Sequence, residues 1–407
     1  MSNEYQNNHY VPEWYQKRFL PNDQKDKELY YLNLKPDTLV DPRGVTHVKK
    51  AIHKQGFRLC FVESDLYTTQ FGPTQSRDIE KIFFGEIDRK GQKAVDYFEN
   101  FSHPSINGHA FQDMMMYMST QKLRTPKGLG WIGSKVGTMD RQTILNQMLR
   151  LQQLYCAIWA ECVWLIADAS KSETKFIISD HPVTVYNRRC GPRSQRCRGF
   201  NEPDIWLQGT HTIFPLSLDK VLILTNLSWI RNPYQSPVNP RPNPNPMRNA
   251  IFKFTEIQTL RYLTEQEVQE MNFVIKSRAL HYIASAKKEW LYPDKYISKS
   301  NWNNYGDGYL FMPDPRAVHL GGEIFWGNKD GTGGAMDEYG RRPGEKDYGK
   351  EGRTLEEAET LYRFKGEFAR LNGPRRRGRT FDAMRLDPEY DSESLHQYHM
   401  GLSGKNN

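Results

Sequence analysis

The alternation of apolar and polar residues predicts short strands at the start of the chain and helices after them. Turn residues separate three alternating runs of the kind that form half-buried strands, at 28–34, 45–52 and 57–61. Apolar positions then recur at helical spacing in two segments, 73–98 and 110–123. The first half of the chain should therefore place a small sheet beside a pair of amphipathic helices.

The middle of the chain predicts a loop, a long helix and further strands. Residues 125–137 combine a proline with several glycines, which is typical of a loop. A helix is expected over 140–169, and its nearly all-apolar end should lie in the centre of the core. Strands are expected afterwards, at 175–179, 211–217 and 221–225.

Capping signals and prolines organise the remainder of the chain. Residues 233–246 hold six prolines, which predicts an extended loop. Thr264 and Glu267 form a capping box for a helix reaching about Ala286, and a second capping box at 354–357 opens a helix to about 371. The order of elements predicts an α+β fold, with a mostly helical core packed on a small mixed or antiparallel sheet.

Composition predicts two parts of the chain and a compartment of the cell. Beyond Trp290 the sequence becomes rich in Gly, Asn and Asp, so we expect a core domain at 1–300 and an accessory extension at 301–407, partly disordered after about 373. The first residues lack the apolar stretch of a signal peptide, and 155–169 is too short for a membrane span. The five cysteines include no CxxC pair, which favours reduced thiols in the cytoplasm.

Charge points to the class of partner. The net charge is +8, which favours an anionic partner such as nucleic acid, a nucleotide or a phospholipid surface. The densest basic segment is a loop with five arginines: Arg188, Arg189, Arg193, Arg196 and Arg198. The run 375–379 holds four more and is expected to be a flexible electrostatic tail.

Three short motifs end in or contain a proline and bring polar side chains to the end of a regular element. They are His9-Tyr10-Val11-Pro12, Gln121-Lys122-Leu123-Arg124-Thr125-Pro126 and Ile178-Ser179-Asp180-His181-Pro182-Val183. This HYVP, QxxRTP and SDxPV series resembles the family known as domain of unknown function 4238, over roughly residues 8–285. The family has no well-established reaction, and some of its members resemble single-gene anti-phage defence proteins. The resemblance therefore implies a defence role more than it implies a chemistry.

Each motif offers candidate site residues together with a structural alternative. His9 lies where Pro12 can open a helix, so it can be an acid or base, bind a ligand, or hydrogen-bond the helix N-terminus. Gln121 and Arg124 share one face of a last helical turn, suited either to holding a phosphate or to capping carbonyls. Asp180 can orient a histidine, bind a metal, act as a base, or build a turn before Pro182.

Two further sets of candidates accompany the motifs. Asp180 is followed by His181, a second candidate for acid–base chemistry, and the arginine loop that begins at Arg188 and Arg189 comes directly afterwards. This places positive charge near the supposed site and favours a phosphate-bearing substrate. Glu86 either joins a metal site with His9 and Asp180 or belongs to a solvated helix face.

These features predict an intracellular defence-type effector that acts on nucleic acid or nucleotides, with nuclease-like hydrolysis. A divalent metal is one option for its cofactor. The alternative is a non-enzymatic sensor that binds a phage component or nucleic acid. The chain contains no P-loop, Rossmann fingerprint, HExxH or GxSxG, which argues against those chemistries. An enzyme needs its motif residues in one solvent-reachable cleft, whereas a binding scaffold leaves them apart or fully buried in capping roles.

Overall fold

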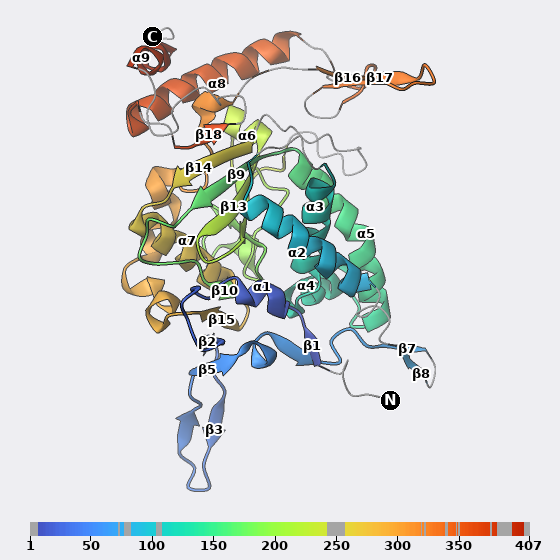
Figure 1. Cartoon of the computed structure of the whole chain (residues 1–407), viewed down its shortest axis with the longest axis vertical. Helices are drawn as coiled ribbons and strands as arrows, with labels where there is room; N and C mark the ends of the chain where they lie inside the picture. The colour runs from blue at the N-terminus through green and yellow to red at the C-terminus, as the bar shows by residue number, and fades with distance from the viewer. Residues whose placement is uncertain are drawn as a thin grey trace.

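The chain folds as an α+β protein built around a six-stranded sheet (Figure 1). The computed structural model describes residues 7–71, 74–76, 83–102, 108–241, 257–318, 320, 323–337, 341–346, 348, 351–374, 377–380 and 393–402. The helices are α1 Glu13–Lys17, α2 Gly85–Glu99, α3 Gly108–Leu123, α4 Pro126–Val136, α5 Arg141–Ala160, α6 Leu227–Arg231, α7 Glu265–Arg278, α8 Glu351–Asn372 and α9 Glu393–Leu402.

The strands form two main sheets and several hairpins. The central sheet has the order β11-β12-β13-β9-β14-β18, from β9 Cys162–Asp168, β11 Thr184–Asn187, β12 Thr210–Pro215, β13 Lys220–Asn226, β14 Ile257–Tyr262 and β18 Arg379–Thr380. The second sheet has the order β10-β15-β2-β5, from β2 Glu28–Asn33, β5 Ile52–Gly56, β10 Ile178–Ser179 and β15 Tyr282–Ser285. The two-stranded pairs are β1 Asn7–His9 with β6 Val62–Ser64, β3 Thr38–Val40 with β4 Thr46–Val48, β7 Thr69–Phe71 with β8 Thr74–Ser76, and β16 Glu323–Gly327 with β17 Gly333–Asp337.

Helices cover the central sheet because β9 is apolar on both faces. All seven residues of β9 are buried, and the strand lies between antiparallel β13 and parallel β14. The rings of Phe98 on α2 and Phe111 on α3 pack against Trp164 of β9, at centroid distances of 5.2 and 5.8 Å. Figure 1 places α2–α5 on one side of the sheet and α7 on the other.

The predicted helix over 140–169 is wrong in its last third. Helix α5 ends at Ala160, and the apolar end of the segment is strand β9. A fully buried strand and a buried helix both appear as continuous apolar runs, so periodicity does not separate them. The β-branched and aromatic side chains of Val163, Trp164 and Ile166 favour the strand once neighbours exist on both edges.

The predicted loop at 125–137 is also wrong, because its proline and glycines are helix signals here. Thr125 is the N-cap of α4 and accepts a hydrogen bond from the Gly128 amide, while Pro126 occupies the first turn. Gly137 ends the helix at φ +70°, in the left-handed region. A Cβ at Gly128 would lie 2.4 Å from the Lys122 carbonyl oxygen, so glycine lets α4 begin directly against the end of α3.

Other predictions are confirmed or corrected at their boundaries. The capping box of Thr264 and Glu267 is present, but α7 ends at Arg278, and Tyr282–Ser285 form β15 instead of continuing the helix. The expected strand at 57–61 is a short 3-10 turn, Phe57–Leu59. The expected helix start near 73 falls partly outside the described residues, and α2 begins at Gly85.

The chain beyond residue 300 contributes to the main core before it forms the outer helices. Trp302, Tyr305 and Phe311 are buried in the same cluster as the β9 side chains, and the Trp302 ring lies 5.0 Å from that of Tyr186. Arg375 and Arg376 lie outside the described residues. The expectation of a flexible tail is wrong for Arg377–Arg379, because Arg377 donates to Glu267 at 2.7 Å and Arg379 begins β18.

Candidate functional site

The three motifs meet at the end of α3. Gln121 Nε2 donates a 2.8 Å hydrogen bond to the Tyr10 carbonyl oxygen of the first motif. The hydroxyl of Thr125 lies 2.8 Å from His181 Nδ1 of the third motif. The second motif therefore lies between the other two, although their sequence positions are far apart.

Gln121 and Arg124 interact with each other and with the protein interior. Arg124 Nε donates to Gln121 Oε1 at 2.9 Å, which confirms that the two side chains share a helix face. The Arg124 guanidinium also pairs with Asp88 of α2 at 2.9 Å, and Gln121 and Arg124 are at most 1% exposed. Both side chains thus join the first motif to α2 and α3.

Asp180 joins the third motif to the start of β15. Its carboxylate accepts hydrogen bonds from three consecutive backbone amides, those of Leu280, His281 and Tyr282, at 2.9, 2.6 and 2.8 Å. Burial raises the pKa of Asp180, and these three amides together with the charge of Lys127 oppose that rise. The side chain is 3% exposed and holds the turn that follows α7.

His9 and Glu86 interact with residues of their own segments. His9 Nε2 lies 3.8 Å from Glu13 at the start of α1, and the described part of the chain shows no contact between His9 and Asp180 or His181. Glu86 pairs with Lys90 one turn along α2 at 3.0 Å, and its side chain is 58% exposed. The structure therefore does not bring these two candidates to the third motif.

His181 opens onto a cavity of about 210 Å³ between α4 and the arginine loop. The wall from α3 and α4 includes Lys122, Lys127, Trp131 and Lys135, and Tyr155 comes from α5. The opposite wall comes from the loop before β12 and includes Arg196, Arg198, Phe200, Glu202 and Asp204. Lysines and arginines outnumber the two carboxylates of the lining, so the cavity favours an anionic ligand.

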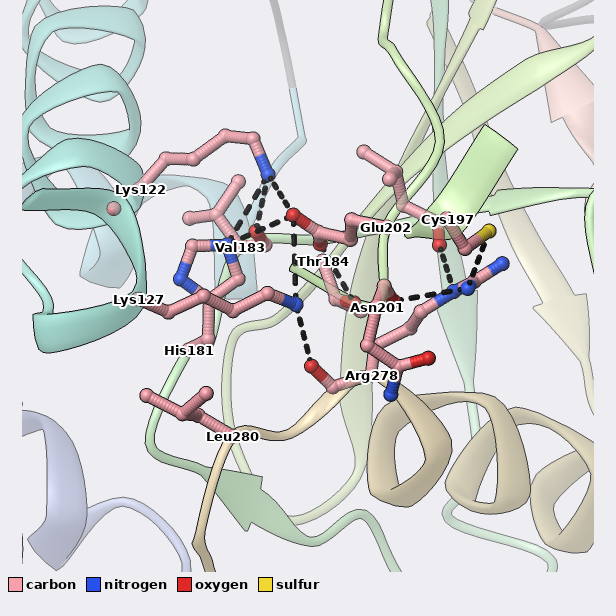
Figure 2. Close-up of polar contacts among 12 residues, drawn as sticks. Lys122, Lys127, His181, Val183, Thr184, Cys197, Asn201, Glu202, Arg278 and Leu280 are labelled. Carbon is pink, nitrogen blue, oxygen red and sulfur yellow. Dashed lines mark hydrogen bonds and ion pairs between the residues drawn. The ribbon is translucent and has the colours of Figure 1, made fainter. Parts of the chain in front are cut away.

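A buried charge cluster forms the inner end of this cavity (Figure 2). One carboxylate oxygen, Glu202 Oε2, lies 3.1 Å from Lys122 Nζ, 3.6 Å from Lys127 Nζ and 3.2 Å from His181 Nε2. The other oxygen accepts a hydrogen bond from the Thr184 hydroxyl at 3.3 Å. Lys122 also donates to the Val183 carbonyl, and Lys127 donates to the Arg278 carbonyl at 2.6 Å.

Burial shifts the protonation of the cluster. It lowers the pKa of His181 to about 4, although Glu202 opposes the shift, so the imidazole is neutral near pH 7. Burial also lowers the pKa of Lys127 to about 8, again opposed by Glu202. Burial by itself raises the pKa of Glu202. Lys122, Lys127 and His181 outweigh this effect and hold the pKa of Glu202 well below its usual value.

The neutral His181 has partners for either tautomer. With the proton on Nε2 it donates to Glu202, and its bare Nδ1 accepts from the Thr125 hydroxyl. With the proton on Nδ1 it donates to Thr125, and its bare Nε2 accepts from Lys122 at 3.2 Å. A proton can therefore move from one ring nitrogen to the other without leaving a buried nitrogen unpaired, which suits acid–base chemistry.

The five arginines of the loop have different surroundings in the folded protein. Arg196 and Arg198 are exposed and line the cavity, and their guanidinium groups make no hydrogen bond or ion pair within the described ranges. Arg188 instead lies over the Trp229 ring, 5.5 Å from its centroid, and Arg189 and Arg193 are exposed but do not line the cavity. Within this loop, the positive charge that lines the cavity thus comes from Arg196 and Arg198.

Four residues of the cluster were not predicted as site residues from the sequence: Lys122, Thr125, Lys127 and Glu202. Two of them, Lys122 and Thr125, lie inside the second motif, and Lys127 follows it directly. Helical spacing places Gln121 and Arg124 on one face of a helix. It does not predict the second helix, which begins at Pro126 and directs Lys127 inward. Glu202 is an acid directly after the arginine-rich stretch of its loop, and no local pattern there predicted a buried position.

The described ranges show neither a metal-binding group nor a membrane-spanning helix. There, no group of three or more His, Cys, Asp or Glu side chains is arranged to hold a metal ion. The same ranges contain no helix with the length and apolar character needed to cross a bilayer.

The fold and the cavity define an α+β protein with a basic, partly buried pocket beside a neutral histidine. Residues 135–289 match the model of a family described as protein of unknown function (DUF4238), which confirms the family resemblance over this part of the chain. The match includes the third motif, the arginine loop and Glu202, while the first two motifs precede it. No curated protein and no solved structure gives a significant match to the chain.

Proposed function

We propose that this protein binds a phosphate-bearing substrate, a nucleotide or a nucleic-acid strand, in the cavity beside His181 and hydrolyses it. The observation that carries the proposal is the convergence of Lys122, Lys127 and a neutral histidine in one cavity that solvent can enter. Phosphoryl chemistry needs positive groups where negative charge develops and a group that moves a proton at neutral pH.

The side chains that line the cavity have separate roles in this hydrolysis. His181 takes a proton from an attacking water, a new P–O bond forms, the bond to the leaving oxygen breaks, and a lysine ammonium protonates that oxygen. Lys122 and Lys127 stabilise the negative charge on phosphate oxygens during this exchange. Arg196 and Arg198 attract the substrate at the mouth, and Trp131 and Phe200 offer ring faces for a base.

The defence role in the cytoplasm extends the proposal on the basis of the family resemblance. A protein that degrades nucleotides or nucleic acid stops phage replication, because it removes the precursors or the template that replication needs. The trigger would then be a phage component that acts on the site.

The second candidate function is a non-enzymatic sensor that binds nucleic acid or a phage component. It is favoured by one observation: Gln121, Arg124 and Asp180 are fully buried and hydrogen-bonded to protein groups. In this alternative the motifs build the fold, and the cavity binds its ligand without turnover.

The test is incubation of the purified protein with separate pools of RNA, DNA and nucleoside triphosphates, with and without divalent metal. We expect product from at least one pool, loss of product in His181→Asn and retention in His9→Ala, since His9 does not line the cavity. Salt-sensitive binding with no product in any pool would support the sensor. Equal turnover by wild type and His181→Asn would remove His181 from the chemistry.

A further inference from the structure

Glu202 occupies the place where the cavity is best equipped to hold an anion. Lys122 Nζ, Lys127 Nζ and His181 Nε2 all approach a single oxygen of this carboxylate, at 3.1, 3.6 and 3.2 Å. Figure 2 shows the Glu202 side chain reaching between the two lysines from the opposite wall. Convergence of several donors on one oxygen is how proteins hold a phosphate or carboxylate ligand.

The cluster carries more positive than negative charge even with Glu202 in place. The lysines share this interior with Arg278, whose guanidinium donates to the carbonyls of Cys190 and Asn201 at 2.6 and 2.9 Å. The carboxylates are Glu202 and Asp180, and Asp180 is engaged by three backbone amides. A carboxylate supplies one negative charge to the lysines, whereas a phosphate monoester supplies up to two, so a phosphate balances the cluster better.

The segment that carries Glu202 also carries the arginines at the mouth. Arg196, Arg198 and Glu202 lie within one stretch of loop, between β11 and β12. Asn201, the residue before Glu202, has φ +53°, in the left-handed region that asparagine tolerates better than most residues. A ligand that binds the two arginines therefore acts on the same segment that holds Glu202 against the lysines.

We propose that Glu202 is a built-in occupant of the phosphate site and that substrate phosphate displaces it, so the described structure is an autoinhibited state of the cavity. This inference rests on the proposed function, because it concerns regulation of the same site. Displacement leaves the lysines and His181 facing the substrate, and binding to Arg196 and Arg198 moves the loop outward. The apparent affinity of the site is then reduced by the fraction of molecules in which Glu202 is bound.

The experiment compares wild type with Glu202→Gln, which keeps the shape and removes the charge, using inorganic phosphate and pyrophosphate as probes. Calorimetry should show binding that is tighter by on the order of tenfold in Glu202→Gln, because the competing charge is absent. Asp204→Asn is the matched control, since Asp204 lines the same cavity without contacting the lysines, and its affinity should change less than about twofold. Unchanged or weaker binding in Glu202→Gln, or an equal gain in Asp204→Asn, overturns the inference.

A second variant covers the case in which Glu202→Gln does not fold. Glu202→Asp keeps the charge but shortens the side chain, so it should also bind phosphate more tightly than wild type; weaker or equal binding overturns the inference. The hydrolysis assay separates the two proposals. Tighter phosphate binding with no turnover of any substrate pool supports the built-in occupant and rejects the hydrolytic function. Turnover in wild type with no gain in Glu202→Gln supports hydrolysis and rejects the occupant.

Discussion

Thr125 Oγ1 lies 2.8 Å from His181 Nδ1, and the same oxygen accepts the amide hydrogen of Gly128 at the start of α4. One hydroxyl therefore caps a helix and orients the imidazole that faces the cavity. This relationship joins the second and third motifs through a residue that serves the fold and the candidate chemistry together.

Replacing Thr125 with valine should cost both interactions while keeping the side-chain shape. Loss of an N-cap costs about 1 kcal/mol, and an unpaired buried ring nitrogen costs about 1–3 kcal/mol, so we expect a loss of about 2–4 kcal/mol in the free energy of unfolding. Urea titration measures it. Thr138→Val, which removes an acceptor at an exposed turn, is the control and should change stability by less than about 1 kcal/mol. Equal losses in both variants would contradict the double role.

The Arg124–Asp88 pair should matter for stability far more than Glu86, although both acids lie on α2. Arg124 is fully buried, so Asp88→Asn removes the main counter-charge of a buried guanidinium and should cost about 3 kcal/mol or more. Glu86→Gln breaks only a surface pair with Lys90 and should change the free energy of unfolding by about 0.5 kcal/mol at most. Thermal unfolding of the two variants side by side gives the comparison. A large loss in Glu86→Gln would indicate a role that the exposed pair does not explain.

His181 should make the protein less stable in mild acid. Its pKa is about 4 in the folded state and about 6.5 in the unfolded chain, so the unfolded chain binds the proton first as pH falls. Between pH 6.5 and 5 this difference removes about 2 kcal/mol of stability. His181→Asn should lose that share of the pH dependence in urea titrations at several pH values. His211, whose pKa burial lowers to about 3, retains its own share and serves as the internal comparison.

Lys127 should act in the alkaline range with the same direction of pH dependence as His181. Its pKa is about 8 in the folded state against about 10.4 when unfolded, so above pH 8 the unfolded chain holds more protons and stability rises with pH. Lys127→Met should flatten this rise between pH 8 and 10. A slope identical to that of wild type would mean that Lys127 keeps an ordinary pKa in the folded protein.

Salt dependence should separate the two halves of the arginine loop. Arg196→Ser with Arg198→Ser should weaken binding of RNA or DNA and reduce the slope of log K against log salt by up to about 0.9 per lost contact for duplex DNA. Arg189→Ser with Arg193→Ser removes the same charge from exposed positions outside the cavity and should have the smaller effect. Equal effects from both pairs would indicate a diffuse surface attraction instead of binding at the cavity.

The sequence by itself determined the features that depend only on residues close together along the chain. The capping box at Thr264, the helix ending before Pro126 and the shared face of Gln121 and Arg124 depend on neighbours within four residues, and all are present. The α+β class is likewise confirmed, because the alternation of strand and helix patterns is a property of composition and spacing.

Tertiary structure alone decided the rest. Segment 162–168 is a strand because β13 and β14 supply hydrogen-bonding partners on both of its edges. Thr125 and Gly137 cap a helix whose first turn holds Pro126, because α4 can pack closely against α3 at Gly128. Glu202 lies among Lys122, Lys127 and His181 because segments separated by up to 80 positions come together there, and no pattern along the chain records a contact of that range. The strength of those ion pairs comes from burial, which is a property of the folded molecule as a whole.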